Sequence, residues 1–272
     1  MKFDYEKKKW GTGEVDLSPG FLGATRLKHC LRALGPISGG KILEVGCGGG
    51  SFARAIKRHR PELEVLGCDL SREVITEAKK KDSGVEYRQA DIYCLPFKET
   101  SFEAVVSFDV FEHLERPGQA LAEVFRVLRP GGLLHFFAPI EGNSLTLFQL
   151  FSQRLYRIKK EYTGHVQAYT LRSLQELLIK IGFSFREARF SCFYLYQLVD
   201  LGYFGFLKLR GRNAAVSVEG YLDFAAGSFY DRLLGLGKSL FGWLTYGENE
   251  IWPILPGARS VAGGIHITAM KG

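Results

Sequence analysis

Apolar and amphipathic segments alternate along the first half of the chain. Short apolar runs predict buried strands at 41–45, 64–70, 85–90, 102–108 and 133–139. Between these runs, apolar residues recur at helical spacing over 51–60, 72–81 and 118–128, and Ser71 stands where a helix N-cap is expected. This alternation is typical of an α/β chain that folds as a Rossmann-like, doubly wound sheet with helices on both faces.

The rhythm changes after about residue 140. Amphipathic patterns predict helices over 143–161 and 170–183, with Thr170 as the N-cap of the second, and two closing strands over 184–193 and 263–270. The segment between those strands, 194–261, is rich in Phe, Tyr, Leu, Trp and Gly. It is too long for a hairpin loop, so we expect a C-terminal insertion, helical over 227–247, between the last two strands.

Composition narrows the class of protein only modestly. The 272 residues are 46% hydrophobic and 24% charged, which is ordinary for a globular protein. The first ten residues lack the apolar centre of a signal peptide, and no apolar run reaches the roughly 18 residues of a membrane span. Five cysteines without CxxC spacing favour a reducing, cytoplasmic location over a disulfide framework or a zinc site. The net charge of +7 is compatible with acidic partners and equally with a solvated, lysine-rich surface.

Gly46, Gly48 and Gly50 follow the first predicted strand and open the first helix, where glycines let a ligand approach the backbone closely. Asp69 ends the next strand, where a carboxylate can accept hydrogen bonds from ribose hydroxyls. A nicotinamide dinucleotide would use the same pair of features. Three further features instead favour a nucleoside cofactor that carries an amino acid. They are Glu44 before the first glycine, the spacing G-x-G-G-G-S, and Asp91 after the third strand.

Five motifs in order resemble those of class I S-adenosylmethionine-dependent methyltransferases over about 40–140: LEVGCGGG, CDLS, ADIYCLPF, FEAVVSFDVFEHL and VFRVLRPGGLLHFFAP. The resemblance implies S-adenosylmethionine as cofactor and a seven-stranded, mostly parallel sheet whose last strand is antiparallel. We accordingly expect a core of 41–193 with 262–272, an N-terminal arm and leading helix (1–40) over the cofactor cleft, and at 194–261 the inserted hydrophobic lid or membrane-facing segment. By position the resemblance implies these cofactor-binding residues: Glu44, Gly46, Gly48, Asp69, Leu70, Asp91, Ile92, Phe108 and Arg26. Arg26 would grip the cofactor carboxylate, although a surface arginine on a leading helix is an equal alternative.

A second group of polar residues follows the fourth strand. The stretch FDVFEHLERP carries Asp109, Glu112 and His113, and His165 lies in TGHVQAYT. The pattern resembles the ubiquinone-biosynthesis O-methyltransferases and the small-RNA 3′-end 2′-O-methyltransferases, which place E-x-x-E-H there and use a divalent ion. Asp109 departs from that pattern. We hypothesise that Asp109, Glu112, His113 and His165 bind Mg²⁺ or a similar ion. Alternatively, His113 or His165 is the catalytic base, or the pair Glu112–His113 only orients the loop.

The leading functional expectation is methyl transfer to a small or lipid-linked acceptor, with oxygen favoured as the accepting atom by the subgroup resemblance. The alternatives are a non-catalytic S-adenosylmethionine-binding module, an RNA 2′-O-methyltransferase and a nicotinamide dehydrogenase. Nucleic acid is disfavoured because no dense basic tract is interleaved with aromatic residues. The oligomeric state does not follow from the sequence.

The acceptor site is expected between the N-terminal arm, residues 140–165 and the insertion. Candidate wall residues are aromatic: Tyr5, Trp10, Tyr156, Tyr162, Tyr203 and Tyr221. Trp243 and Trp252 are expected to be core residues of the insertion. The amphipathic pattern over 227–247 also raises the hypothesis of peripheral membrane contact. Its apolar positions and the basic residues nearby are Phe229, Leu233, Leu236, Leu240, Trp243, Arg232, Lys238, Arg154, Arg157, Lys159 and Lys160.

Overall fold

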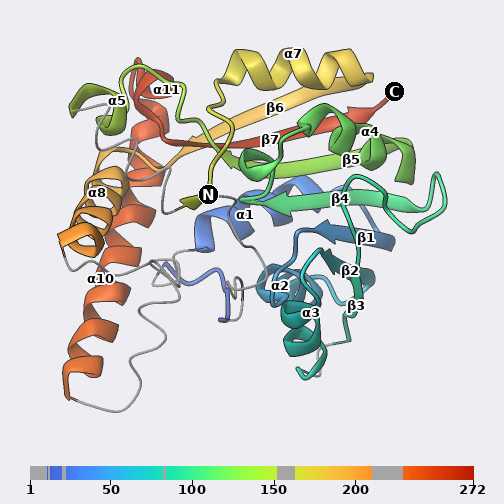
Figure 1. Ribbon diagram of the computed structural model, residues 1–272, viewed down its shortest axis with the longest axis horizontal. Coiled ribbons are helices and arrows are strands. Elements are labelled where there is room, and N and C mark those ends of the chain that lie inside the picture. Colours follow the sequence, from blue (N-terminus) through green and yellow to red (C-terminus); the bar gives the residue numbers. More distant parts are fainter. Residues whose placement is uncertain (1–10, 12, 20–22, 82–83, 152–162, 210–228) are drawn as a thin grey trace.

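Seven strands form one sheet at the centre of the protein (Figure 1). The computed structural model describes residues 11, 13–19, 23–81, 84–151, 163–209 and 229–272, and for residues 151, 203–209 and 229–239 it describes the backbone alone. The strands are β1 Gly40–Val45, β2 Leu63–Asp69, β3 Glu86–Gln89, β4 Phe102–Phe108, β5 Leu128–Pro139, β6 Phe183–Ser191 and β7 Gly264–Lys271. Their order is β3-β2-β1-β4-β5-β7-β6, and β7 runs antiparallel to both of its neighbours. The predicted fold class is therefore confirmed.

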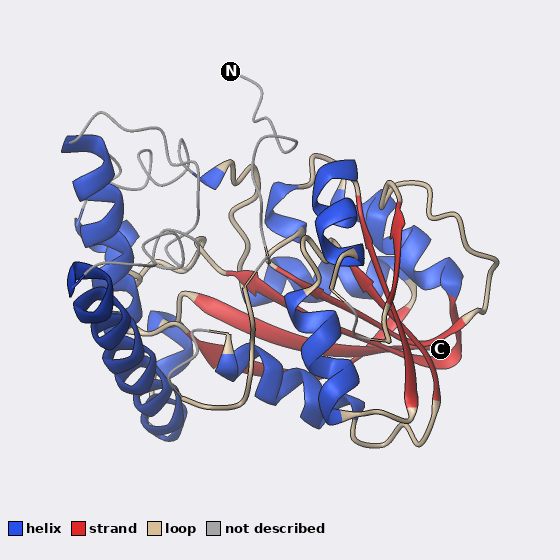
Figure 2. Cartoon of the chain, turned by 90° about the horizontal axis from the view of Figure 1, so that it is seen from below, coloured by secondary structure: helices blue, strands red, loops and turns tan. Residues whose placement is uncertain are grey.

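Helices cover both faces of the sheet (Figure 2). The hydrophobic core on one face takes side chains from α1 Ala24–Leu34, α2 Ser51–His59 and α3 Arg72–Lys79, and the core on the other face takes them from α4 Pro117–Val127 and α7 Leu171–Ile181. Strand β4 illustrates the pattern: Ala104 and Val106 pack towards α1–α3, whereas Val105 packs towards α4. Because successive side chains point to opposite faces and both faces are buried, the strands read as continuous apolar runs.

The predicted helix caps are present. The Ser71 hydroxyl accepts a hydrogen bond from the backbone N–H of Val74 at 3.4 Å, at the start of α3. Thr170 begins α7 with a reciprocal pair of hydrogen bonds to Ser173, and Gly182 ends that helix in a left-handed conformation with φ of 108°. These local signals fix where the helices begin and end, because each cap satisfies a backbone group that the helix itself leaves unpaired.

Two predicted boundaries were wrong. The helix predicted over 118–128 and the strand predicted over 133–139 left the RPGG stretch between them as a break, but β5 begins at Leu128 and the stretch forms an irregularity within it, where its register with β4 shifts. The helix expected from residue 143 begins only at Leu147, as α5 Leu147–Phe151. The side-chain amide of Asn143 instead donates to the carbonyls of Arg259 and Ala262. These bonds hold the residues before α5 in turns. The remainder of that predicted helix, 152–162, lies outside the described residues.

The segment between β6 and β7 contains α8 Tyr194–Leu209, α10 Phe229–Ile251, the 3₁₀ helix η3 Trp252–Ile254 and α11 Ala258–Val261. Helices α8 and α10 lie side by side at the end of the sheet where β6 finishes (Figure 1). The two ends of this insertion meet, because the Gly263 N–H donates to the carbonyl of Cys192 at 2.9 Å. Gln197 reinforces the junction by donating to the carbonyls of Cys192 and Val261.

The insertion is less buried than its composition suggested. Trp252 was expected in the core and is partly buried: it packs against the core on Phe193, with ring centroids 5.6 Å apart. Trp243 was also expected in the core, but 57% of it is exposed. This difference arises because α10 faces the rest of the protein with polar residues: Asn249 and Glu250 reach α1, and Glu248 caps α8. Among the helices that the structure describes, none is long and apolar enough to cross a membrane.

Candidate functional site

The glycine loop after β1 has a backbone conformation that disfavours any residue larger than glycine. Gly46, Gly48 and Gly50 have φ values of 70°, 52° and 78°. A Cβ atom on Gly46 would lie 2.3 Å from a methyl group of Val110, and one on Gly50 would lie 2.3 Å from the Tyr87 hydroxyl. Glycine is therefore needed at these two positions for conformation and for space.

Asp69 ends β2 beside this loop. Its Oδ2 accepts a hydrogen bond from the Gly48 N–H at 2.9 Å, and its Oδ1 accepts one from the Ser71 N–H at 2.9 Å. The side chain is half-buried, and the next residue, Leu70, is 56% exposed. The carboxylate is thus held in place by backbone donors at the carboxyl edge of the sheet, with an apolar surface next to it.

Glu44 lies inside β1 and is 2% exposed. Burial raises the pKa of its carboxyl group well above the usual range, the negative charge of Asp69 adds to the rise, and a hydrogen bond with the backbone of Ala53 opposes it. Its Oε2 has no hydrogen-bond partner among the described residues. The Glu44 carboxyl group, two residues before Gly46, is therefore suited to support the backbone of the glycine loop.

The remaining predicted cofactor contacts lie along the same edge. Asp91 is exposed, and its Oδ1 accepts from the Tyr93 N–H at 2.9 Å in the turn after β3. Ile92 is half-buried against the core. Phe108 ends β4 and stacks on Phe52 of α2, with ring centroids 4.1 Å apart. Parallel strands deliver these side chains to one edge because their carboxyl ends coincide.

Part of the N-terminal arm lies against the glycine loop. The Ser51 N–H donates to the carbonyl of Gly11 at 3.2 Å. Arg54, which is 5% exposed, donates to the carbonyls of Gly49 and Gly13 and pairs with Glu14. One buried arginine therefore fastens residues 13–14 to the loop, a role that no sequence motif indicated.

Arg26 and Asp109 form an ion pair at the ends of α1 and β4. The Arg26 Nε lies 3.2 Å from Asp109 Oδ2, and its guanidinium group stacks over the Phe137 ring at 4.1 Å from the centroid. Asp109 adopts φ of 54°, a left-handed conformation that Asp tolerates better than most residues. The predicted fourth metal ligand thus pairs with Arg26, and among the described residues the metal-binding group consists of the other three alone.

Glu112, His113 and His165 do come together. One ligand atom from each lies within 4.8 Å of the others, and the Nε2 atoms of both histidines are 4.0 Å from Glu112 Oε1. Glu112 is fully buried, and neither of its carboxyl oxygens has a hydrogen-bond partner among the described residues. Burial raises its pKa well above the usual range, and the charge of Asp109 adds to the effect. Two imidazoles around a buried carboxylate are a donor set suited to a divalent cation.

The backbone holds this cluster firmly. The carbonyl of Glu112 accepts from the N–H groups of Val166 and Gln167 at 2.9 and 3.0 Å. The Tyr169 hydroxyl donates to the carbonyl of Phe111 at 3.0 Å. The 3₁₀ turn η2 Phe111–His113 and the segment that carries His165 therefore form one unit, although 51 residues separate His113 from Gly164, whose carbonyl lies 3.4 Å from His113 Nδ1.

Glu141 is a neighbour of this cluster that sequence reasoning missed. It follows β5, is 3% exposed, and its Oε1 lies 2.9 Å from His165 Nδ1. The surrounding letters APIEGNS form no recognisable motif. Only the three-dimensional approach of the 140–142 turn to the His165 segment, 24 residues later, reveals the contact.

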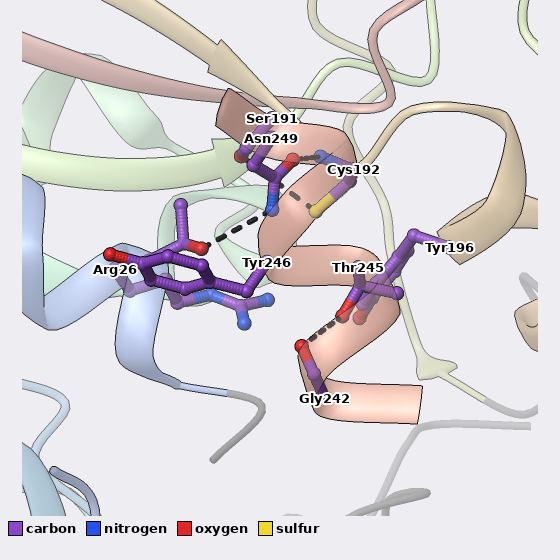
Figure 3. A pocket seen from close by; sticks show the side chains of 9 residues that line it. Arg26, Ser191, Cys192, Tyr196, Gly242, Thr245, Tyr246 and Asn249 are labelled. Carbon is purple, nitrogen blue, oxygen red and sulfur yellow. Dashed lines mark hydrogen bonds between the residues drawn. The ribbon is translucent and has the colours of Figure 1, made fainter. Parts of the chain in front are cut away.

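A small cavity opens where the insertion meets the core, and Arg26 is one of the residues that line it (Figure 3). Side chains from α1, the end of β6, α8 and α10 line it: Thr25, Arg26, Ser191, Cys192, Tyr196, Gly242, Thr245, Tyr246 and Asn249. The lining is polar and aromatic, and Asn249 bridges Thr25 to the backbone N–H of Cys192. Of the aromatic wall residues expected from sequence, Tyr5, Trp10, Tyr156, Tyr162 and Tyr221 lie outside the described residues, as does the Tyr203 side chain. Arg154, Arg157, Lys159 and Lys160 also lie outside them, as do the side chains of Phe229, Arg232, Leu233, Leu236 and Lys238.

Comparisons with known proteins agree on the central region. Residues 43–136 match the methyltransferase domain family. The demethylmenaquinone methyltransferase of Deinococcus radiodurans is 33% identical over 138 residues, which cover 48% of this chain and 57% of the relative. The ubiquinone biosynthesis O-methyltransferase of Alkalilimnicola ehrlichii is 31% identical over 141 residues, covering 50% and 56%. The chain thus spans little more than half the length of these relatives.

Solved structures share the fold over more of the chain. Phosphoethanolamine N-methyltransferase 2 of Haemonchus contortus, solved with S-adenosyl-L-methionine, superposes with a TM-score of 0.60 at 20% identity, covering 97% of this chain and 56% of that one. The [4+2]-cyclase SpnF superposes with a TM-score of 0.60 at 18% identity, covering 91% and 80%. Since proteins of different activity share it, the fold alone does not fix the reaction. The sequence matches confirm the resemblance to class I methyltransferases.

Proposed function

We propose that the whole chain, whose residues 43–136 match the methyltransferase domain family, is an S-adenosylmethionine-dependent methyltransferase that acts on a small or lipophilic acceptor, with oxygen as the accepting atom. One observation carries the proposal: the glycine loop and Asp69 form a rigid, glycine-requiring edge within the matched region. Relatives named as quinone-biosynthesis and fatty-acid methyltransferases support the acceptor class.

The cofactor side is assigned to the residues at the ends of β1 to β4. In this proposal Gly46 and Gly48 face the methionine part, with Glu44 behind them. Asp69 binds the ribose and Leu70 packs on the adenine; Asp91, Ile92 and Phe108 complete the nucleoside site. The exposed face of Leu70 beside a fixed carboxylate supports this assignment. The bound cofactor supplies a methyl group already activated as a sulfonium, so the protein's task is to align the acceptor and exclude water.

Arg26 has a different assignment from the one suggested by sequence. Its guanidinium pairs with Asp109, at the end of β4, and also borders the cavity under the insertion. We therefore place it between the cofactor edge and the acceptor side, where it fixes Asp109. The small cavity, with its hydroxyl, amide and aromatic groups, marks the junction of insertion and core at which we propose that the acceptor approaches, with the 194–261 insertion as the lid of that site.

Glu112, His113 and His165 are proposed to hold a divalent cation such as Mg²⁺. The fit rests on the buried, unpartnered oxygens of Glu112 and on two imidazole nitrogens directed at it. A cation there would act as a Lewis acid towards an acceptor hydroxyl. Without a cation, His113 or His165 remains the candidate base for the hydroxyl proton.

Peripheral membrane contact is the finer part of the proposal. Large apolar side chains of α10 and η3 are exposed, including Leu240, Trp243, Leu244, Ile251 and Ile254. An apolar stripe on a helix that borders the acceptor cavity suits docking on a lipid surface that contains the acceptor. The five free cysteines support a cytoplasmic location.

The deciding experiment is a label-transfer assay. The protein is incubated with methyl-labelled S-adenosylmethionine and a cell lysate, and the organic, small aqueous and macromolecular fractions are separated. Label in the organic fraction is the expected result, and its loss in EDTA would support the cation. Label in RNA or protein would replace the acceptor class, while cofactor binding without any label would favour a non-catalytic binding module.

A further inference from the structure

We propose that Glu141 is a positioning residue: through His165 Nδ1 it fixes the imidazole so that Nε2 faces Glu112, which preforms the cation site of Glu112, His113 and His165. The inference deepens the proposed function and rests on it for the chemical role of the site. The contact itself, 2.9 Å between Glu141 Oε1 and His165 Nδ1, stands on its own.

The first step concerns the tautomer of each imidazole. A ring nitrogen that contacts a carboxylate or a carbonyl oxygen must carry the hydrogen, because those oxygens only accept. His165 Nδ1 faces Glu141 and His113 Nδ1 faces the carbonyl of Gly164. Both neutral rings therefore present the lone pair of Nε2.

The second step is that these lone pairs converge on an acceptor. Each Nε2 is 4.0 Å from Glu112 Oε1, too long for a hydrogen bond. When the Glu112 carboxyl group is ionised and both rings are neutral, three electron-pair donors meet there in a buried place with no hydrogen between them. Two ligands on opposite sides of one ion at about 2.0–2.2 Å stand about 4 Å apart, so a modest contraction of this cluster would bring all three donors to a divalent cation.

The third step is that Glu141 sits on a backbone that cannot easily adjust. The backbone on both sides of Glu141 is hydrogen-bonded: the Ile140 N–H donates to the Gly263 carbonyl and the Gly142 N–H donates to the Tyr169 carbonyl, each at 2.9 Å. The carbonyl of Glu141 itself accepts from the side-chain amide of Gln149, also at 2.9 Å. A Cβ atom on Gly142 would lie 2.8 Å from the Tyr169 carbonyl oxygen. The carboxylate is held as rigidly as the ring it orients, which is the arrangement by which outer residues tune metal-binding histidines.

Mn²⁺ binding tests the inference without any methyl acceptor. Electron paramagnetic resonance of free Mn²⁺ gives the dissociation constant for the wild type, Glu141→Gln and Glu141→Ala at one pH. We expect one site in the wild type, binding about 10–100-fold weaker in Glu141→Ala, and a smaller loss in Glu141→Gln, which can still accept from Nδ1–H. Glu176→Gln, at an exposed α7 carboxylate, should bind as the wild type does.

A second readout separates orientation from general stability. Nitrogen–proton NMR of His165 should show the hydrogen on Nδ1 in the wild type and a mixture of tautomers in Glu141→Ala. Thermal midpoint and S-adenosylmethionine affinity should stay near wild-type values in Glu141→Gln. Equal Mn²⁺ affinity in Glu141→Ala, or no Mn²⁺ binding by the wild type, would overturn the inference. Failure of the label-transfer assay with Mn²⁺ binding intact would instead count against the proposed function.

Discussion

Asp69 and Glu112 are two carboxylates near the carboxyl edge of one sheet, and the protein treats them in opposite ways. Each oxygen of Asp69 accepts a backbone N–H at 2.9 Å. Neither oxygen of the fully buried Glu112 has a hydrogen-bond partner among the described residues. Burying a carboxylate without partners costs several kcal/mol. The difference indicates that Asp69 belongs to a preformed cradle, whereas Glu112 is arranged for a cation or a proton that the polypeptide does not supply.

The largest effect is expected from a substitution in the glycine loop that lies next to Asp69. Gly46→Ala places a methyl group 2.3 Å from Val110 in a left-handed conformation, so we expect cofactor affinity to fall by about 100-fold or more. Calorimetry with S-adenosylmethionine measures it. Gly131→Ala is the matched control, because Gly131 has φ of 73° but no neighbour within 4 Å of its added Cβ. Equal losses in both variants would attribute the effect to backbone strain alone.

A smaller effect is expected when only one carboxylate is altered. Asp69→Asn sets an amide N–H₂ against a backbone donor and removes the charge that would accept from ribose hydroxyls. We expect cofactor affinity to fall about 10–100-fold, since hydrogen bonds to charged groups contribute roughly 1.5–3 kcal/mol. Glu64→Gln, on the exposed side of the same strand, should leave the dissociation constant unchanged. Wild-type affinity in Asp69→Asn would remove this residue from the site.

A third buried polar group differs from both carboxylates because it consists of histidines. His135 and His266 are buried with their ring centroids 6.1 Å apart, and they should affect how stability depends on pH. Burial lowers the pKa of His135 to about 3 and that of His266 well below the usual value. Below a pH of about 6.5, the ordinary pKa of histidine, these imidazoles are protonated in the unfolded chain but stay neutral in the folded protein. The free energy of unfolding therefore falls as the pH drops. Each of the two should contribute about 2 kcal/mol of loss between pH 7 and 5.

Urea unfolding at the two pH values checks this prediction, with His135→Gln as the test variant. The glutamine can still bond to the Thr268 hydroxyl, which lies 3.0 Å from His135 Nδ1, but it does not titrate. The variant should lose about 2 kcal/mol less than the wild type on acidification. An unchanged pH dependence would show that another group controls acid unfolding.

The smallest effect concerns the exposed side of the insertion. Trp243→Ser removes an exposed ring from α10, so the free energy of unfolding should change by no more than about 0.5 kcal/mol. Binding to anionic liposomes at low salt should weaken about five-fold, the order expected when one apolar anchor is lost. Ile179→Ser, at a 63% exposed position on α7, should bind liposomes like the wild type. A wild-type protein that does not co-sediment would dismiss membrane contact.

The sequence was informative where function depends on the local chain. Strands, caps and the glycine loop could be predicted because their signals lie within a few residues, as in Ser71 or Thr170. Contacts between distant segments could not be predicted. Glu141 meets His165 through a turn without a motif, Asp109 turns to Arg26 on another helix, and Trp243 is exposed because polar residues occupy the inner face of α10.

One hydrogen bond of 2.9 Å, from the Gly263 N–H to the Cys192 carbonyl, joins the two ends of the insertion. A change in the length of the insertion is therefore inexpensive for the sheet itself, since doubling the length of a surface loop costs only about 0.6 kcal/mol of closure entropy. Such changes are limited by the parts of the insertion that contact the rest of the protein, namely the buried Ala258 and Val261 and the end of α10 that bonds to α1. In the laboratory the same junction offers a place to replace the outer part of the insertion and to test whether the proposed acceptor preference changes while the glycine loop and Asp69 stay untouched.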